Sequence, residues 1–268
     1  MSLQLISTGK GPDLILIHGW GISSFVFNKV VPVLSEHFTV HCLDLPGYGE
    51  NVDVYIDYAS LDETVSAIGE VIPSGSHILG WSLGGTIALK YALAYPRRVR
   101  SLMCVCATPR FCDDDTEIDE AEKYGCKWPG VSPVFIRAFA RNLSPENKDV
   151  VCEKFFGMQA MGSPTIRQDI KELRHAMKHN VRPGYEVLAG GLKILESTDL
   201  REECEKLQVP LLAMFGENDG IVPDGVGAFW EKNKDAQVKI FKDAAHNPFL
   251  SSPDEFARTV ITFCRAYA

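Results

Sequence analysis

Short apolar, β-rich runs alternate with helical patterns along most of this chain. Its 268 residues are a length that α/β folds often carry as one domain. The strand candidates are Leu3–Ser7, Leu14–Ile17, Thr39–Leu43, Ser76–Leu79, Ser101–Cys106, Pro210–Phe215 and Val238–Phe241. The helix candidates are Val26–Ser35, Leu61–Val71, Leu83–Tyr95, Gly227–Lys232 and Pro253–Tyr267. This alternation predicts a mostly parallel central sheet with helices on both faces.

The alternation is interrupted between residues 111 and 185. This stretch contains no convincing strand, several short helical patterns and five prolines. We expect a single α/β domain whose core comprises residues 1–110 and 186–268, with residues 111–185 forming a helical lid. Ligands of such sheets bind outside the carboxyl ends of the strands, so the residues that follow each strand are the first candidates for chemistry.

Composition and charge exclude several classes of protein. The net charge of −8 argues against broad binding to nucleic acid or to an anionic membrane, which requires an excess of Lys and Arg. No apolar run is long enough to span a bilayer, and the first residues do not resemble a secretion signal. The eight cysteines form no CxxC pair, as is typical of reduced thiols. We therefore expect a cytoplasmic, monomeric protein that binds neither nucleic acid nor membrane.

The segment Gly80-Trp81-Ser82-Leu83-Gly84 reads G-x-S-x-G between an apolar run and a helix-forming one. In that context the motif is typical of a strained strand-to-helix turn that presents a nucleophilic serine. The glycines allow strand and helix to approach where a larger side chain would clash. An ordinary Gly/Ser turn is the alternative, so the assignment of Ser82 as nucleophile depends on partner residues elsewhere.

Two later strand ends supply an acid and a base. Asp219 lies in a turn after the sixth strand candidate, and His246 lies in the loop after the seventh. The chain order Ser82, Asp219, His246 is the order of the α/β-hydrolase triad. In such a triad the histidine takes the serine proton and later protonates the leaving group, while the acid fixes the tautomer of the histidine.

The fourth part of the predicted site is an oxyanion hole. His18-Gly19-Trp20-Gly21 follows the second strand candidate, and Leu83 directly follows the nucleophile. We expect the backbone N–H groups of Trp20 and Leu83 to face the reacting carbonyl oxygen.

Other acids and histidines have simpler structural interpretations. Asp199, Asp224 and Asp243 are alternative acids, but Asp219 is favoured because its tight turn directly follows a buried strand. The other histidines of the core are expected to be structural, with His18 supporting its own loop: His18, His37, His41 and His77.

No metal or cofactor is expected. His175 and His179 are four residues apart on a predicted helix, a spacing that metal ligands can share, but no third ligand accompanies them. The chain also lacks a phosphate-binding or dinucleotide-binding glycine motif.

Several segments together resemble one enzyme family. They are Leu16–Gly21, Asp44–Gly49, Leu79–Gly85, Met158–Gly162 with Arg167–Asp169, Gly190–Leu195 with Thr198–Arg201, and Ala244–Phe249. On these residues the chain resembles the pimeloyl-acyl-carrier-protein methyl ester esterases of the α/β-hydrolase superfamily. The match inside the predicted lid narrows the resemblance from superfamily to family. It implies a serine carboxylesterase of biotin biosynthesis, which converts the methyl ester of pimeloyl-acyl-carrier protein into the free acid and methanol.

The resemblance also implies where the substrate and its carrier bind. In that family the acyl chain lies between core and lid, which implicates Trp20, Ser82, Leu83, Phe155, Phe156, Gly157, Met158, Gln159 and His246. Plain packing of lid on core is the alternative for the apolar members of this set. Basic lid residues of the family dock the acidic acyl-carrier protein, and the matching positions are Lys154, Arg167 and Lys171. A fourth matching position holds the uncharged Val150.

Charge patterning agrees with a docking surface. Residues 123–182 contain eleven basic and five acidic side chains, a net charge of +6 in a chain of −8, so the rest carries −14. An acidic carrier would be attracted by this segment within about one Debye length, roughly 8 Å at physiological salt. A Lys/Arg-rich insertion that serves solubility is the alternative interpretation.

Two other functions use the same motifs. A general short-chain carboxylesterase or a carbon–carbon-bond hydrolase would employ the same triad. A ligand-binding protein with a vestigial triad would keep the fold without turnover. Dehalogenase chemistry is disfavoured because the turn carries Ser rather than Asp.

Overall fold

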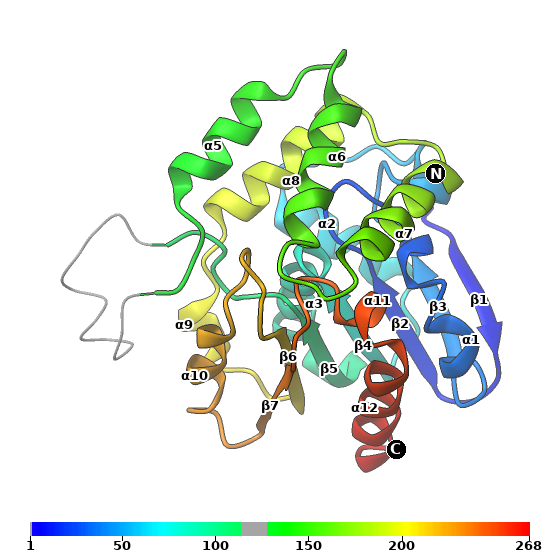
Figure 1. The fold of residues 1–268 in the computed structure, drawn as a ribbon. Helices are drawn as coiled ribbons and strands as arrows, with labels where there is room; N and C mark the ends of the chain where they lie inside the picture. The colour runs from blue at the N-terminus through cyan, green and yellow to red at the C-terminus, as the bar shows by residue number, and fades with distance from the viewer. Residues whose placement is uncertain (1, 114–127) are drawn as a thin grey trace.

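The structure is a computed structural model that describes residues 2–113 and 128–268. Across these residues, seven strands form one sheet in the order β1-β3-β2-β4-β5-β6-β7. β1 is antiparallel to β3, and all other neighbours are parallel. The strands are β1 (Leu5–Gly9), β2 (Asp13–Ile17), β3 (Thr39–Leu43), β4 (Ser76–Trp81), β5 (Val99–Val105), β6 (Leu211–Gly216) and β7 (Ala236–Phe241). The predicted α/β architecture is confirmed (Figure 1).

Each of the seven predicted strands is present, with ends that differ by at most two residues. β2 lies inside the sheet, and its residues from Leu14 to Ile17 are all buried, which explains their unbroken apolar pattern. β1 is an edge strand with mostly exposed residues. It extends to Gly9, opposite Thr39, because pairing with β3 rather than the hydrophobic pattern sets its end.

Helices cover both faces of the sheet. α2 (Leu61–Val71) contacts α3 (Leu83–Ala94), and α1 (Val31–Leu34) contacts α12 (Pro253–Ala266). Figure 1 shows these two pairs on opposite faces of the sheet. The shorter helices are α10 (Gly227–Trp230), α11 (Pro248–Ser251), and the 3-10 helices η1 (Ser24–Phe27), η2 (Gly49–Asn51), η3 (Pro96–Arg98) and η4 (Asp224–Val226). Within the described ranges, no helix combines the length and apolar character required to cross a membrane.

The single helix predicted over Val26–Ser35 is wrong. η1 and the four-residue α1 form in its place. Pro32 is the second residue of α1, where a helix does not require the N–H that proline lacks. In one continuous helix, Pro32 would have to donate a hydrogen bond to the carbonyl of Asn28. The chain therefore restarts its helix beside the proline.

Among the described residues, five helices lie between β5 and β6 in the chain. They are α5 (Pro133–Asn142), α6 (Lys148–Gln159), α7 (Ile166–His179), α8 (Tyr185–Ser197) and α9 (Arg201–Cys204). Figure 1 shows α5–α8, coloured green to yellow, over the edge of the sheet at which the parallel strands end. We call α5–α8 the cover helices. The predicted lid, residues 111–185, includes α5–α7 and ends where α8 begins.

The turn between β4 and α3 has room for backbone only. A Cβ on Gly80 would lie 2.2 Å from the carbonyl oxygen of Gly84. A Cβ on Gly84 would lie 2.3 Å from the carbonyl oxygen of His18. Both neighbours are backbone atoms, which cannot rotate away. Gly80 therefore allows the start of α3 to approach β4, and Gly84 allows it to pack against the end of β2.

Replacing Gly84 by alanine should destabilise the protein by about 1–3 kcal/mol, the usual effect of overpacking, because β2 or α3 must shift. Gly157→Ala is the matched control, since a Cβ at that position in α6 would meet nothing within 4 Å. Alanine is favoured over glycine inside a helix by about 0.5–1 kcal/mol, so this variant should be more stable. Urea unfolding measures both, and a Gly84→Ala variant as stable as the parent would contradict the prediction.

Candidate active site

Ser82 occupies the turn from β4 to α3 in a backbone conformation that few residues other than glycine adopt. Its φ is 54° and its ψ is −122°. Its N–H donates to the carbonyl oxygen of Val105 at 2.9 Å, which attaches the turn to β5. Such a conformation stores roughly 1–3 kcal/mol of strain and is found mainly at functional sites. The turn presents the hydroxyl group to the loop that carries His246.

His246 links Ser82 to Asp219. Its Nε2 lies 3.0 Å from Oγ of Ser82, and its Nδ1 lies 2.8 Å from Oδ2 of Asp219. With Nδ1–H donating to the carboxylate, Nε2 accepts the hydrogen bond of the serine. All three residues are buried. The structure therefore brings the three predicted triad residues into one hydrogen-bonded chain.

Two backbone groups hold the carboxyl group of Asp219. Its Oδ1 accepts the N–H of Ile221 at 2.8 Å and that of Val222 at 3.0 Å. Oδ2 is thereby directed toward the imidazole. The tight turn after β6 thus orients the acid, as the sequence interpretation required.

The alternative acids have other surroundings. Asp199 contacts Arg110 at 2.8 Å and Arg201 at 2.7 Å. Burial opposes ionisation of Asp199, but the hydrogen bonds from Arg201 and Arg110 prevail and lower its pKa to about 2. Asp224 is the first residue of η4, and Asp243 lies in the turn after β7, where its N–H donates to the carboxylate of Glu217. Within the described part of the chain, none of these three carboxylates is bonded to the triad histidine.

The predicted oxyanion donors lie beside Ser82. Leu83 is the first residue of α3, where an N–H has no partner inside the helix and the helix dipole favours negative charge. The loop of Trp20 packs on the same turn, since a Cβ on Gly19 would lie 3.3 Å from the Cβ of Ser82. The indole Nε1 of Trp20 donates to the carbonyl oxygen of Leu188 in α8 at 2.8 Å. The role of the two N–H groups as oxyanion donors stays a prediction.

The neutral form of His18 holds the loop that carries Trp20. Its Nδ1–H donates to the carbonyl oxygen of Gly19 at 2.8 Å, and its Nε2 accepts the N–H of Leu45 at 2.9 Å. Burial lowers the pKa of His18, against the opposing influence of Asp44. A second ring proton would abolish the contact with Leu45. His18 therefore supports its own loop.

The end of α6 is bonded to the loop of His246. The carbonyl oxygen of Gln159 accepts the backbone N–H of His246 at 3.2 Å. The side-chain amide of Gln159 is fully buried, and neither its oxygen nor its nitrogen has a hydrogen-bond partner among the described residues. Phe156 is buried as well, whereas Gly157 and Met158 are half-buried. Of the α6 residues implicated in substrate binding by resemblance, Gln159 thus contacts the triad loop directly.

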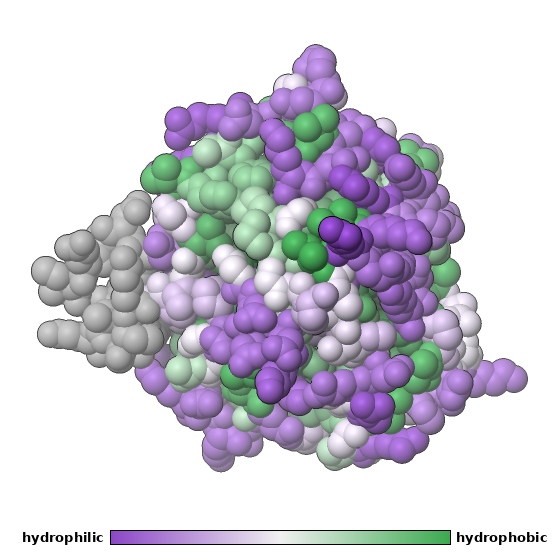
Figure 2. All heavy atoms as spheres, viewed as in Figure 1, coloured by the Kyte–Doolittle hydropathy of each residue, from purple (hydrophilic) through white to green (hydrophobic). Residues whose placement is uncertain are grey.

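A file of aromatic rings leads from Trp20 to the surface of α5. Ring centroids are 5.2 Å apart between Trp20 and Phe155, 5.8 Å between Phe155 and Phe139, and 4.9 Å between Phe139 and Phe135. Trp20 and Phe155 are buried, while Phe139 and Phe135 are half-buried. Figure 2 shows apolar surface over this part of α5. We call these four residues the aromatic file.

Comparison with known proteins identifies the family. Residues 14–259 match the alpha/beta hydrolase family. The pimeloyl-acyl-carrier-protein methyl ester esterase of Aliivibrio fischeri (strain ATCC 700601 / ES114) is 39% identical over 261 residues, which cover 97% of this chain and 96% of that protein. The protein of the same name from Vibrio vulnificus (strain YJ016) is 36% identical over 256 residues, 95% of each chain.

The chain belongs to the pimeloyl-acyl-carrier-protein methyl ester esterase family. It is therefore a carboxylic ester hydrolase with the α/β-hydrolase fold. Solved structures share that fold. The esterase EaEST from Exiguobacterium antarcticum has a TM-score of 0.82 at 23% identity over 98% of this chain and 95% of its own. The enol-lactonase from Burkholderia xenovorans LB400 has a TM-score of 0.76 at 17% identity over 98% and 96%.

The predicted carrier-docking residues of this esterase lie on two helices. Lys154 is exposed on α6, and Arg167 and Lys171 are exposed on α7. The latter two line one shallow groove together with Arg174 and Lys178. Within the described ranges, the three docking candidates form no ion pair with an acid, whereas Arg174 contacts Glu153 at 3.3 Å. Val150 is 56% exposed. Two residues included in the sequence charge count, Lys123 and Lys127, lie outside the described residues.

The two histidines considered as metal ligands pack on one aromatic ring. His179 stacks on Phe25 with a centroid distance of 3.5 Å, and His175 meets the same ring edge-on at 5.3 Å. This contact attaches α7 to η1. It gives both histidines a packing role on the surface of the core.

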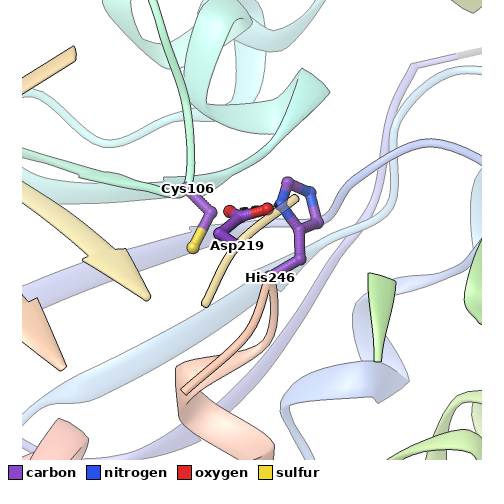
Figure 3. A group of neighbouring side chains, drawn as sticks. All are labelled: Cys106, Asp219 and His246. Carbon is purple, nitrogen blue, oxygen red and sulfur yellow. Dashed lines mark hydrogen bonds and ion pairs between the residues drawn. The ribbon is translucent and has the colours of Figure 1, made fainter. Parts of the chain in front are cut away.

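Sequence reasoning missed three features of the esterase. Phe135 and Phe139 are four apart on α5, and this spacing was the available signal for their ring contact. Arg174 and Lys178 follow Arg167 at helical intervals that place them on one face, which would have assigned them to the groove. The third feature is Cys106, which lies directly after β5 and beside Asp219 (Figure 3).

Ser82→Ala should lower ester turnover by about 10⁶-fold, because the nucleophile is lost. Asp219→Asn should lower it by about 10⁴-fold through the wrong histidine tautomer. Asp224→Asn is the matched control and should retain activity. Hydrolysis of p-nitrophenyl acetate and labelling by a fluorophosphonate measure the outcome. Full labelling of the Ser82→Ala variant would refute the assignment of the nucleophile.

Proposed function

We propose that this esterase hydrolyses the methyl ester at the end of a pimeloyl chain carried by acyl-carrier protein, producing the free acid and methanol for biotin biosynthesis. The assembled Ser82–His246–Asp219 chain supports ester hydrolysis. The substrate is inferred from relatives of that name, which are 34–39% identical over nearly the whole chain.

The first half of the reaction forms an acyl-enzyme. Nε2 of His246 accepts the proton of Ser82 as Oγ attacks the ester carbonyl carbon. The N–H groups of Trp20 and Leu83 donate hydrogen bonds to the carbonyl oxygen as negative charge develops on it. His246 then protonates the departing methoxy oxygen, and methanol leaves. The Asp219 carboxylate stabilises the imidazolium that exists between the two proton transfers.

The second half of the reaction releases the acid. Water replaces methanol, His246 takes one of its protons, and the resulting hydroxide attacks the acyl carbon. The same two N–H groups stabilise the second tetrahedral intermediate. Its collapse returns the proton to Oγ of Ser82 and frees the carboxylic acid.

The cover helices act as a lid in this proposal. Ser82 is only 3% exposed and His246 is fully buried, so the acyl chain enters when α5–α8 move or when side chains between them rotate. We propose that the acyl chain lies along the aromatic file, which is apolar and begins at Trp20. The flexible, unbranched and apolar chain of a pimeloyl ester suits contact with these aromatic rings.

We further propose that the acidic carrier docks on Lys154, Arg167 and Lys171, beside the groove on α7. These cations are exposed and lack acidic partners among the described residues. A cytosolic location is supported by the seven described cysteines, all of which are unpaired thiols. The monomeric state stays a prediction, which sedimentation tests.

The carrier-bound methyl ester should be turned over with a higher kcat/KM than free methyl pimelate. The double variant Arg167→Glu/Lys171→Glu should raise KM for the carrier-bound ester by roughly tenfold, and added salt should do the same to the parent. Free methyl pimelate should be unaffected. Lys10→Glu is the matched control, because it reverses the charge of an exposed lysine in the turn after β1. Equal kcat/KM for both substrates and indifference to salt would favour a general short-chain esterase.

Phe139→Ala should raise KM for the carrier-bound ester by about tenfold or more, since a lost apolar contact in a binding pocket is worth about 1–3 kcal/mol. Hydrolysis of p-nitrophenyl acetate, which is too short to reach α5, should not change. Val134→Ala, on the same helix and 63% exposed, is the control. An equal fall in kcat/KM for long and short esters would indicate a general structural effect and contradict the proposed path of the acyl chain.

A further inference from the structure

We propose that Cys106, Asp219 and His246 form an inhibitory binding site for a thiophilic divalent cation of the Zn²⁺ or Cd²⁺ class. The site is distinct from the catalytic use of the triad, although its effect on turnover rests on the proposed function of Asp219 and His246. Occupation of the site would switch the esterase off reversibly.

The three residues stand at the ends of three neighbouring strands. Cys106 follows β5, and the turns after β6 and β7 carry Asp219 and His246. One thiol sulfur, one carboxylate oxygen and one imidazole nitrogen all lie within 4.8 Å of one another, and all three residues are buried. Figure 3 shows the Asp219 carboxyl group between the thiol and the imidazole. Sulfur, nitrogen and oxygen ligands in one small cluster are the donor set that zinc binds.

The thiol of Cys106 interacts with the side chain of Asp219, which has other partners as well. Asp219 already accepts two backbone N–H groups and one imidazole N–H. The sulfur of Cys106 reaches the carbonyl oxygen of Ala245 only at 4.0 Å, the outer limit for a sulfur hydrogen bond. Burial, together with the nearby Asp219, raises the pKa of this thiol well above its ordinary value. Without a metal it therefore stays protonated and is a poor nucleophile.

The backbone at Cys106 is also unusual. Its φ is 45°, a left-handed conformation that it shares with Ser82 and Asp243 alone among the described residues other than glycine. Its N–H donates to the carbonyl oxygen of Met214 at 2.7 Å, which holds the residue at the strand end. The fold thus keeps a cysteine in a strained position beside the triad.

Binding of the cation would remove the general base. The metal would bond to the sulfur of Cys106, to a carboxylate oxygen of Asp219 and to Nδ1 of His246. The thiol proton and the Nδ1 proton would both leave to solvent, so two protons are released for each ion bound. His246 would then lose the Asp219 contact that stabilises its cationic form.

The test uses the intact, chelator-washed enzyme with added Zn²⁺ or Cd²⁺. Hydrolysis of p-nitrophenyl acetate by the parent should fall slowly, since the ion must enter a buried site, and should recover with EDTA. Cys106→Ala and Cys106→Ser should require at least about tenfold more cation, since even loss of an outer-sphere partner weakens metal sites by about 10–100-fold. Cys104→Ala is the matched control, because Cys104 is a buried thiol on β5, two residues before Cys106. It should behave as the parent does.

A second readout does not depend on turnover. Cd²⁺ bound to the parent or to Ser82→Ala should give a cadmium–thiolate absorption band that Cys106→Ala lacks. Equal inhibition of the parent and of both Cys106 variants would overturn the proposal, as would a band that persists without Cys106. Since the band is measured in the Ser82→Ala background too, failure of the metal site is distinguishable from failure of the triad assignment.

Discussion

The contact between the start of α3 and the ends of β2 and β4 determines the geometry of the whole site. Gly80 and Gly84 leave only backbone at this contact, so the helix begins within van der Waals distance of two strands. Ser82 is thereby held in its strained conformation, and the first N–H of the helix lies beside the hydroxyl group of Ser82. Each of these consequences follows from the same shortage of space. A side chain at either glycine would separate the nucleophile from the groups around it.

The remaining catalytic groups reach Ser82 because β4, β5, β6 and β7 run parallel. Parallel strands end at one edge, so residues distant in sequence meet there once the strands are paired in order. The acid follows β6 and the base follows β7, and two backbone N–H groups orient Asp219 before it contacts the imidazole. The cover helices then enclose the chain of hydrogen bonds. In a buried site these polar contacts are stronger than they would be in water.

The sheet and the triad could be predicted from sequence because their signals are local. Leu14–Ile17 reads as a buried strand by itself, and G-x-S-x-G between a strand and a helix specifies a turn. The split of the helix near Pro32 also has a local signal, the proline itself, although one continuous helix was predicted there. The aromatic file was not, because the contact between Phe139 and Phe155 joins two helices whose packing no periodicity encodes. Cys106 likewise acquires its surroundings only when β5, β6 and β7 lie side by side.

The hydrogen bond from the backbone of His246 to Gln159 has a mechanical consequence. The last turn of α6 is attached to the very loop that carries the proton acceptor. A displacement of α6 that admits an ester must therefore disturb the support of the imidazole as well. If the substrate enters by a displacement of α6, as proposed above, the loop of His246 regains its full support only when α6 returns to the position described here.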